Sequence, residues 1–202
     1  METSAAPPRL RDRQREQTRG ELAVAALALA IDQGLANVRV PQIAAAAGVS
    51  TRTFNNYFSS KEAAITWPAR RRAARMAEDL LTRPADEPLA AALEAAIVGR
   101  YGAAQQDGLP PGWLCDFRRL VAAEPALHGE YLKASHTAEL ALAAAIAARG
   151  GYDELGSAVL AAMVVGAERA AVMRWMQDTT RSRRLVETVR TAVRQAVAGV
   201  GP

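Results

Sequence analysis

Hydrophobic residues recur along this chain at the three- and four-residue spacing of amphipathic helices, and no run alternates apolar and polar residues as a strand does. Gly-rich, Pro-rich or polar breaks separate the periodic stretches. After the third helix of the N-terminal region, which starts at residues 60–61 and meets a kink or a new start at Pro68, helices are predicted over residues 89–106, 112–123, 125–149, 153–177 and 183–198. The pattern therefore predicts an all-α protein.

Residues 40–62, VPQIAAAAGVSTRTFNNYFSSKE, contain the most specific signals in the chain. Pro41 suits the first turn of a helix, where its missing N–H is not needed. Gly48 reaches the left-handed conformation that ends a helix, and Ser50 is a good N-cap for a second helix. The segment is therefore predicted to form two short helices joined by a tight turn.

The second of these helices is predicted to present polar side chains outward. Phe54 and Phe58 lie one turn apart and are expected to pack inward, which leaves Thr51, Arg52, Thr53, Asn55 and Asn56 for the other faces. Arg can bind guanine, Asn can bind adenine, and the Thr methyl group can contact the thymine methyl group. Lys61, at the start of the third helix, can reach a phosphate. This arrangement predicts a helix-turn-helix that binds the DNA major groove.

At these residues the chain resembles the TetR family of bacterial transcriptional regulators, over about residues 18–65. The matching positions are Ala25, Ala26, Gly34, Ile43, Ala44, Ala47, Gly48, Val49, Ser50, Thr53, Phe54, Tyr57, Phe58, Ser60, Lys61 and Glu62. Many residues at set distances make this a specific signal. The resemblance implies that Thr51, Arg52, Thr53 and Asn55 face base edges. It also implies that Asn56, Tyr57 and Lys61 mostly hold the DNA backbone.

Three positions depart from the family pattern. Ala30 replaces an aromatic residue in the first helix, and Pro41 offers no side-chain hydrogen bond. Arg39 stands where a Thr cap is usual, and a guanidinium cannot accept a hydrogen bond from a backbone N–H. Arg39 is instead assigned as a phosphate contact, and base recognition is expected to fall on the helix after Gly48.

Composition and charge agree with a soluble DNA-binding protein. The chain has 202 residues, is 50% hydrophobic, and has a net charge of +4 with a pI of about 9.7. Its single cysteine cannot form an internal disulfide, which fits the cytoplasm. The Arg-rich N-terminus has no apolar run typical of a signal peptide, and the apolar run at 22–31 is too short to span a bilayer. Residues 1–17 are interpreted as a basic flexible arm, either a solvated tail or a segment that follows DNA.

The last two helices are candidates for a dimer interface. Val159, Met163, Gly166, Ala170 and Met173 alternate in steps of four and three, which is the spacing of a helix–helix seam, and another face of the same helix is also apolar. The predicted interface residues are Val159, Gly166, Ala170, Met173, Leu185, Val189 and Val193. The alternative is that both helices are ordinary monomer core. The resemblance favours dimerisation, because family members form a four-helix bundle through their last two long helices.

The middle of the chain is predicted to hold a small-molecule effector. In the family, small molecules bind among these helices and shift the spacing of the two DNA-binding heads. The candidate effector residues are Tyr101, Trp113, Phe117, His136, Met163, Glu168 and Trp175, with Arg100, Cys115, Arg118, Tyr131 and Met173 in the same region. A mostly apolar cavity with a few polar groups is the usual form of such a site. Each residue has an alternative as plain core, and Cys115 has one as an inert buried thiol.

The sequence offers little for an enzyme. It has no G-x-S-x-G motif, no phosphate-binding loop and only two histidines, His128 and His136, which lack metal-ligand spacing. We therefore expect no catalytic residues, no metal and no cofactor. A helical adaptor or nucleoid-type DNA binder without an effector is the remaining alternative.

The interpretation is a dimeric transcriptional regulator, most simply a repressor that a small lipophilic effector releases from a pseudo-palindromic operator in double-stranded DNA. Its domains are predicted as an arm over residues 1–17, a three-helix helix-turn-helix domain over 18–66, and a helical effector-binding and dimerisation domain over 67–202.

Overall fold

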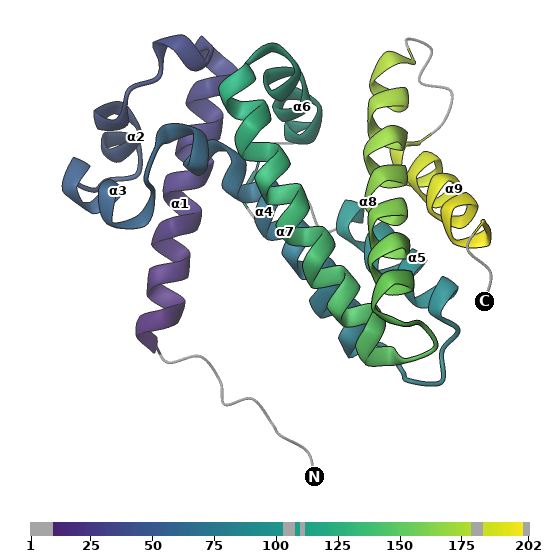
Figure 1. Ribbon diagram of the computed structural model, residues 1–202. Coiled ribbons are helices and arrows are strands. Elements are labelled where there is room, and N and C mark those ends of the chain that lie inside the picture. The colour runs from purple at the N-terminus through teal and green to yellow at the C-terminus, as the bar shows by residue number, and fades with distance from the viewer. Residues whose placement is uncertain (1–9, 103–107, 110–111, 179–183, 200–202) are drawn as a thin grey trace. The chain divides into compact units, whose positions relative to one another are not determined.

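The computed structural model describes residues 10–102, 108–109, 112–178 and 184–199. Within these residues the chain forms α-helices and one 3₁₀ helix and no strand (Figure 1). The prediction of an all-α fold is confirmed. The chain divides into two compact units, Met1–Pro68 and Ala69–Pro202.

The described part of the first unit contains helices that the sequence predicted and one 3₁₀ helix that it did not. These are α1 (Leu10–Gln33), η1 (Leu35–Asn37), α2 (Val40–Ala46), α3 (Thr51–Tyr57) and the first two turns of α4 (Lys61–Thr82). Their apolar residues meet in one small core, in which Leu22, Leu27, Ile43, Phe54 and Ile65 are all at most 1% exposed. Because α2 and α3 have only seven residues each, this shared core, rather than helix propensity, stabilises them.

Part of the predicted N-terminal arm is helical. Helix α1 begins at Leu10, so residues 10–17 of the predicted flexible arm are helical, and residues 1–9 lie outside the described part. This stretch is rich in Arg, Gln and Glu, which favour helix, and the Gln17 side-chain amide donates to Glu21 one turn later over 3.0 Å. Local propensity therefore extends a helix whose apolar face starts only at Leu22.

Helix α4 runs through Pro68 without ending. Proline lacks the N–H that would bond to the carbonyl four residues earlier, so a kink or a new helix start was expected there. Buried apolar residues before Pro68, such as Ile65, and after it, such as Met76 and Leu80, keep the helical spacing on both sides. Packing therefore compensates for the missing hydrogen bond.

The second unit contains the rest of α4 and five further helices: α5 (Leu89–Gly102), α6 (Trp113–Ala123), α7 (Pro125–Arg149), α8 (Glu154–Gln177) and α9 (Leu185–Ala198). Helices α7 and α8 are joined by a short turn and lie side by side, and α9 packs against α8 and α5 (Figure 1). The turn uses Gly150 and Gly151 at φ of 81° and 91°, and the Asp153 carboxylate then caps α8 by accepting from the Gly156 N–H over 2.7 Å.

One apolar core joins most of these helices. Its largest members are Met76, Leu80, Leu93, Ile97, Leu142, Ile146, Leu160, Val164, Val172, Val189 and Val193. The observed helices match the predicted ranges to within two residues, except that α5 is described only to Gly102 and residues 103–106 lie outside the described part.

Helix α8 has the length and composition of a membrane-spanning helix. Its best window has a mean hydropathy of 1.5, and 44% of that window is buried inside the protein. Core helices of soluble proteins have the same composition, and α8 packs against both α7 and α9. Burial inside the protomer thus explains part of its apolar character.

Candidate functional site

The turn between α2 and α3 has the hydrogen bonds of a Schellman motif. The Val49 N–H donates to the Ala44 carbonyl over 2.9 Å, and the Gly48 N–H donates to the Ala45 carbonyl over 3.0 Å. Gly48 has a φ of 68°, a conformation that glycine adopts without the steric cost that a Cβ would add. The two backbone bonds fix the direction in which the chain leaves α2.

Helix α3 then starts from a side-chain cap. The Ser50 hydroxyl accepts from the Thr53 N–H over 3.1 Å and lies 2.9 Å from the Thr53 hydroxyl. The predicted DNA-contacting residues Thr51, Arg52, Asn55 and Asn56 are all exposed, and Thr53 and Tyr57 are half-buried. Because residues three and four apart share a helix face, Arg52 lies beside Asn55 and Asn56 on the exposed surface.

The opposite face of α3 holds the helix against the unit. Phe54 and Phe58 are 1% and 7% exposed, and their ring centroids are 5.7 Å apart. The Arg19 guanidinium of α1 lies over Tyr57 and Phe58, at 6.0 and 5.9 Å from the ring centroids. These contacts position the C-terminal end of α3, and sequence reasoning did not identify Arg19.

Arg39 and Lys61 bind backbone carbonyls of their own unit. The Lys61 ammonium donates to the Leu35 and Val38 carbonyls over 2.7 and 2.9 Å, and the Arg39 guanidinium donates to the Ala36 carbonyl over 2.5 Å. The Gln42 side chain caps α2 by accepting from the Arg39 N–H over 2.7 Å. Both cations thus stabilise the loop around η1, and their contact with phosphate stays a prediction.

The second unit contains a cavity with about 40 Å³ of free volume, which is enough for roughly three water molecules. Helices α4 to α8 all contribute to its wall. Its charged residues are Arg70, Arg72, Arg100, Arg118 and Glu168, its other polar residues are Tyr101, Tyr131 and Ser135, and Met76, Leu114 and Val165 are its larger apolar residues.

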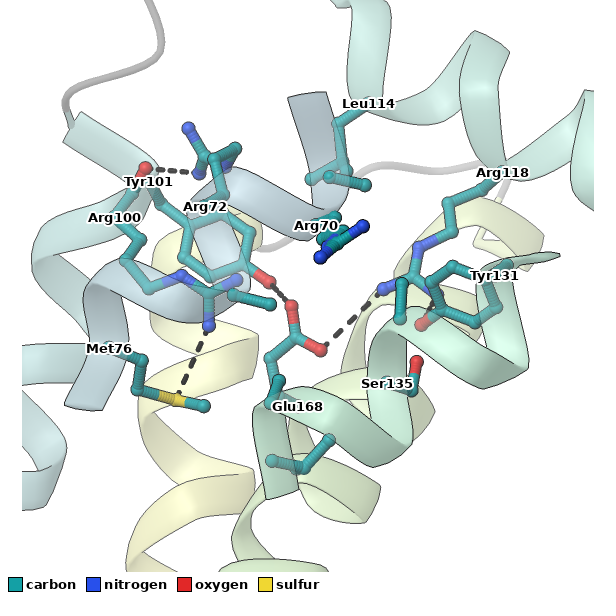
Figure 2. Close-up of a pocket in the computed structure, with 15 residues that line it drawn as sticks. Arg70, Arg72, Met76, Arg100, Tyr101, Leu114, Arg118, Tyr131, Ser135 and Glu168 are labelled. Carbon is teal, nitrogen blue, oxygen red and sulfur yellow. Dashed lines mark hydrogen bonds and ion pairs between the residues drawn. The ribbon is translucent and has the colours of Figure 1, made fainter. Parts of the chain in front are cut away.

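Glu168 is the centre of the polar contacts in this cavity. Figure 2 shows its carboxylate between Tyr101 and Arg118: the Tyr101 hydroxyl donates to Oε1, and Arg118 Nη2 lies 3.5 Å from Oε2. Arg118 Nη1 also donates to the Tyr131 hydroxyl. One buried carboxylate therefore joins α5, α6 and α8, and Arg118 joins this group to α7.

Burial and charge shift two pKa values here. Burial, followed by the Glu168 carboxylate, raises the pKa of Tyr101 well above its usual value, so the hydroxyl stays protonated and donates. Burial opposes the charge on Arg118, but the Glu168 carboxylate and the two tyrosine oxygens outweigh it and raise the pKa of Arg118. Arg118 therefore remains a buried cation.

Comparison with known proteins identifies the chain. A family model described as "Bacterial regulatory proteins, tetR family" matches residues 22–64, and one described as "MftR C-terminal domain" matches residues 87–201, which is more than half of the chain. The chain belongs to the TetR family of transcriptional regulators. Members of this family bind DNA through the helix-turn-helix, act as dimers and bind small molecules.

One relative is similar to this chain in sequence, and solved structures are similar to it in fold. The "HTH-type transcriptional regulator TcmR" of Streptomyces glaucescens is 38% identical over 149 residues, which are 72% of this chain and 66%, just under two thirds, of that protein. The fatty acid degradation regulator FadR of Bacillus halodurans has a similar fold, with a TM-score of 0.60 at 17% identity over 90% of this chain and 95% of that one. So does Thermus thermophilus FadR, solved with lauroyl-CoA, with a TM-score of 0.51 at 22% identity over 90% and 94%.

The cavity of this TetR-family chain brings together only part of the predicted effector set. Tyr101 and Glu168 line it. Trp113 and Phe117 are 2% and 0% exposed and are not among the lining residues, but they pack against residues that are: Arg72 lies over the Trp113 ring and Phe117 contacts the Tyr131 ring. These two aromatic residues therefore form a core layer next to the wall.

Three predicted effector residues lie outside the cavity wall. His136 is exposed on α7, because its neighbour Ser135 takes the inward position and the next residue is rotated by about 100°. Met163 is half-buried and lies near Gly199, the residue that directly follows α9. Trp175 shares the face of Glu168 but sits about 10 Å further along α8. Helix rotation and rise separate these residues from the cavity.

The structure divides the predicted dimer residues into two sets. On α8, Val159 and Met173 are 43% and 36% exposed, Ala170 is exposed and Gly166 is half-buried. On α9, Val189 and Val193 are 0% exposed in the core of the same protomer, and Leu185 packs against that core. Val189 and Val193 are therefore not available to a dimer interface, because the protomer itself already buries them.

Proposed function

We propose that this TetR-family chain is a dimeric repressor that binds a pseudo-palindromic operator through α3 and leaves it when a small molecule enters the cavity of the second unit. The exposed polar face of α3, whose start is fixed by the Schellman turn and the Ser50 cap, is the observation on which the proposal rests. Major-groove recognition needs such a helix, presented rigidly and free of internal contacts on its outer face.

The contacts with DNA are assigned from exposure and chemistry. Arg52 and Asn55 are exposed, suited to guanine and adenine respectively, and share one face of α3. Thr51 is exposed near the start of the same helix, and Thr53 is held by Ser50. Asn56 and Tyr57 border this face and are assigned to the DNA backbone. Two such helices in a two-fold dimer would contact half-sites about one helical turn apart.

The exposed apolar face of α8 supports the dimer. Leu155, Val159 and Met173 remain 71%, 43% and 36% exposed on it, and a Cβ added to Gly166 would meet nothing within 4 Å. An apolar face with a small residue at its centre allows two helices to approach closely. We assign this face of α8, with Leu185 at the start of α9, to the interface.

The first test concerns base recognition by Arg52. The variant Arg52→Ala should weaken binding to the operator by about 1–3 kcal/mol, because a bidentate contact with guanine is lost. Binding to random DNA should fall far less. Arg119→Ala, which removes an exposed arginine of α6, is the matched control and should leave both affinities unchanged. Fluorescence anisotropy measures the affinity of each variant for both DNAs. If Arg52→Ala loses equal affinity for operator and random DNA, the base-contact assignment is wrong.

The second test concerns the dimer. Gly166→Arg places bulk and charge at the centre of the proposed interface and should convert the dimer to a monomer with weak operator binding. Gly129→Arg makes the same change at an exposed position of α7 with open space around it and should leave the dimer intact. Light scattering at micromolar concentration measures the outcome. A wild-type monomer that still binds its operator specifically would refute the dimer.

The third test separates a ligand-controlled repressor from a DNA binder without an effector. A thermal-shift screen should find small molecules that stabilise the protein, and these should weaken operator binding, because a ligand changes DNA affinity only by its preference between two conformations. In vitro transcription from the operator promoter should then rise when the ligand is added. If stabilising ligands leave operator affinity unchanged, the cavity does not regulate DNA binding.

A further inference from the structure

The wall of the cavity has an excess of positive charge. Four arginines line it, and Glu168 is the one carboxylate among the lining residues. A second hollow shares Arg72 and Arg100 with it and adds Arg75 and Asp79. Together the two hollows are lined by five arginines, Arg70, Arg72, Arg75, Arg100 and Arg118, and by two carboxylates, Asp79 and Glu168.

Two arginines of the wall, buried Arg118 and half-buried Arg100, also have unused hydrogen-bonding capacity. Arg118 is only 6% exposed, yet its Nε finds no acceptor among the described residues, and the same holds for Arg100 Nε. The Arg118–Glu168 distance of 3.5 Å is longer than the roughly 2.7–2.9 Å of a charge-assisted hydrogen bond. Buried donors without acceptors are costly, so this site favours a ligand that supplies acceptor oxygens.

We propose that the cavity binds an organic anion, with a carboxylate or similar oxyanion head among Arg70, Arg100 and Arg118 and an apolar body against Met76, Leu114 and Val165. The planar guanidinium group matches a carboxylate with two parallel hydrogen bonds. This inference rests on the proposed ligand control and specifies the chemical class of the effector: charge, and not lipophilicity alone, selects it.

Glu168 gives the site a way to respond to such a ligand. The free volume of about 40 Å³ fits a head of a few heavy atoms, so a larger body must displace side chains. An entering oxyanion repels the Glu168 carboxylate and competes with it for Arg118. Because Glu168 joins α5, α6 and α8 through Tyr101 and Arg118, this competition loosens contacts between three helices.

Matched probes test the charge preference directly. The full-length protein is titrated by calorimetry with 1-naphthoate, 1-naphthalenemethanol and 1-naphthylmethylamine, which share a ring system, and then with octanoate, octanol and octylamine. We expect at least one acid to bind tenfold or more tightly than its alcohol, to weaken as salt rises, and to raise the melting temperature. If neither acid binds more tightly than its alcohol, or if the amines bind best, the proposal is overturned.

Two variants locate the anion. Glu168→Gln keeps an acceptor for Tyr101 but removes the competing charge, so the affinity for the better acid should rise tenfold or more. Arg70→Gln alters an exposed side chain and should lower that affinity at least fivefold, whereas Arg119→Gln, outside the cavity, should not change it. Unchanged or weaker acid binding in a folded Glu168→Gln protein overturns the proposal. Should that variant fail to fold, unchanged acid binding by Arg70→Gln overturns it equally.

The same ligands distinguish this inference from the proposed function. Acid binding is measured on the protein without DNA, and release is measured by operator titration with and without the acid. An acid that binds at the arginines but leaves operator affinity unchanged supports the anion site and refutes ligand control. A lipophilic neutral compound that releases DNA while acids fail to bind supports ligand control and refutes the anion site.

Discussion

The two units of this chain are specified in different ways. In the first, a few residues at fixed positions set the elements: Gly48 ends α2 and Ser50 starts α3. In the second, long helices such as α7 and α8 are apolar on much of their surface, and their partners decide which residues are buried. Local sequence chemistry is therefore sufficient to predict a site built on one short helix. A site built from five helices depends on how those helices pack.

The largest expected effect comes from removing one buried phenylalanine from each unit. Phe54→Ala and Phe117→Ala make the same change at positions that are 1% and 0% exposed, and each should cost about 3–5 kcal/mol of unfolding free energy. Phe54→Ala should abolish operator binding and leave the dimer, while Phe117→Ala should impair ligand binding first.

Denaturant titration with limited proteolysis measures this pair. If the units are specified independently, protease should cut Phe54→Ala within residues 10–68 and leave the second unit protected. Cleavage throughout the chain in both variants would show that the two units unfold as one.

A smaller effect is expected at Lys61, which the sequence assigned to DNA and the structure places on two backbone carbonyls. Lys61→Met should lower the unfolding free energy by about 1.5–3 kcal/mol, because hydrogen bonds from a charged donor to the Leu35 and Val38 carbonyls are lost. Lys133→Met, which breaks an exposed pair with Glu130, is the control and should change stability little. Urea denaturation measures both variants.

The salt dependence of operator binding distinguishes the two roles of Lys61. A phosphate contact by its third N–H would reduce the slope of log affinity against log salt by about one. If Lys61→Met leaves the slope unchanged but lowers stability, Lys61 belongs to the loop around η1 alone. If it reduces the slope but leaves stability unchanged, Lys61 contacts DNA.

The smallest effect compares one glycine from each unit. Gly48→Ala should destabilise by about 1–2 kcal/mol, because a φ of 68° strains a residue with a Cβ even though no atom lies within 4 Å. Gly129→Ala, inside α7 with equally open surroundings, should stabilise by about 1 kcal/mol through helix propensity. Thermal and urea unfolding measure the sign of the change in unfolding free energy for each variant. The same sign for both would show that backbone conformation is not what requires Gly48.

The DNA-binding helix was largely predictable because its determinants are close together in the sequence. The turn, the cap and the inward Phe54 lie within seven residues, so exposure of Arg52 and Asn55 follows from helix geometry. The role of Arg19 was not predictable, since it lies about forty residues away and its contact with Tyr57 exists only after α1 packs. Polar residues 10–17 form the start of α1, where the sequence was interpreted as flexible.

The cavity was predicted only in part because its wall is shared among five helices. Tyr101 and Glu168 were identified, but Arg72 and Ser135 were not. One signal was present: Arg72 stands four residues before Met76 and eight before Leu80, which places a cation on the buried face of α4. His136 shows the opposite error, since a one-residue step on α7 turns its side chain to solvent.

The sequence by itself determined the all-α class, the positions of the helices, the turn at Gly48 and the family, because these follow from spacing, capping and backbone preference within short segments. The tertiary structure decided which of two apolar faces α8 buries, that Val189 and Val193 belong to the protomer core, and that Lys61 binds carbonyls. It also placed four arginines around one carboxylate. Burial and pairing between distant residues depend on helix packing, and a periodic pattern contains no information about which partner each face will meet.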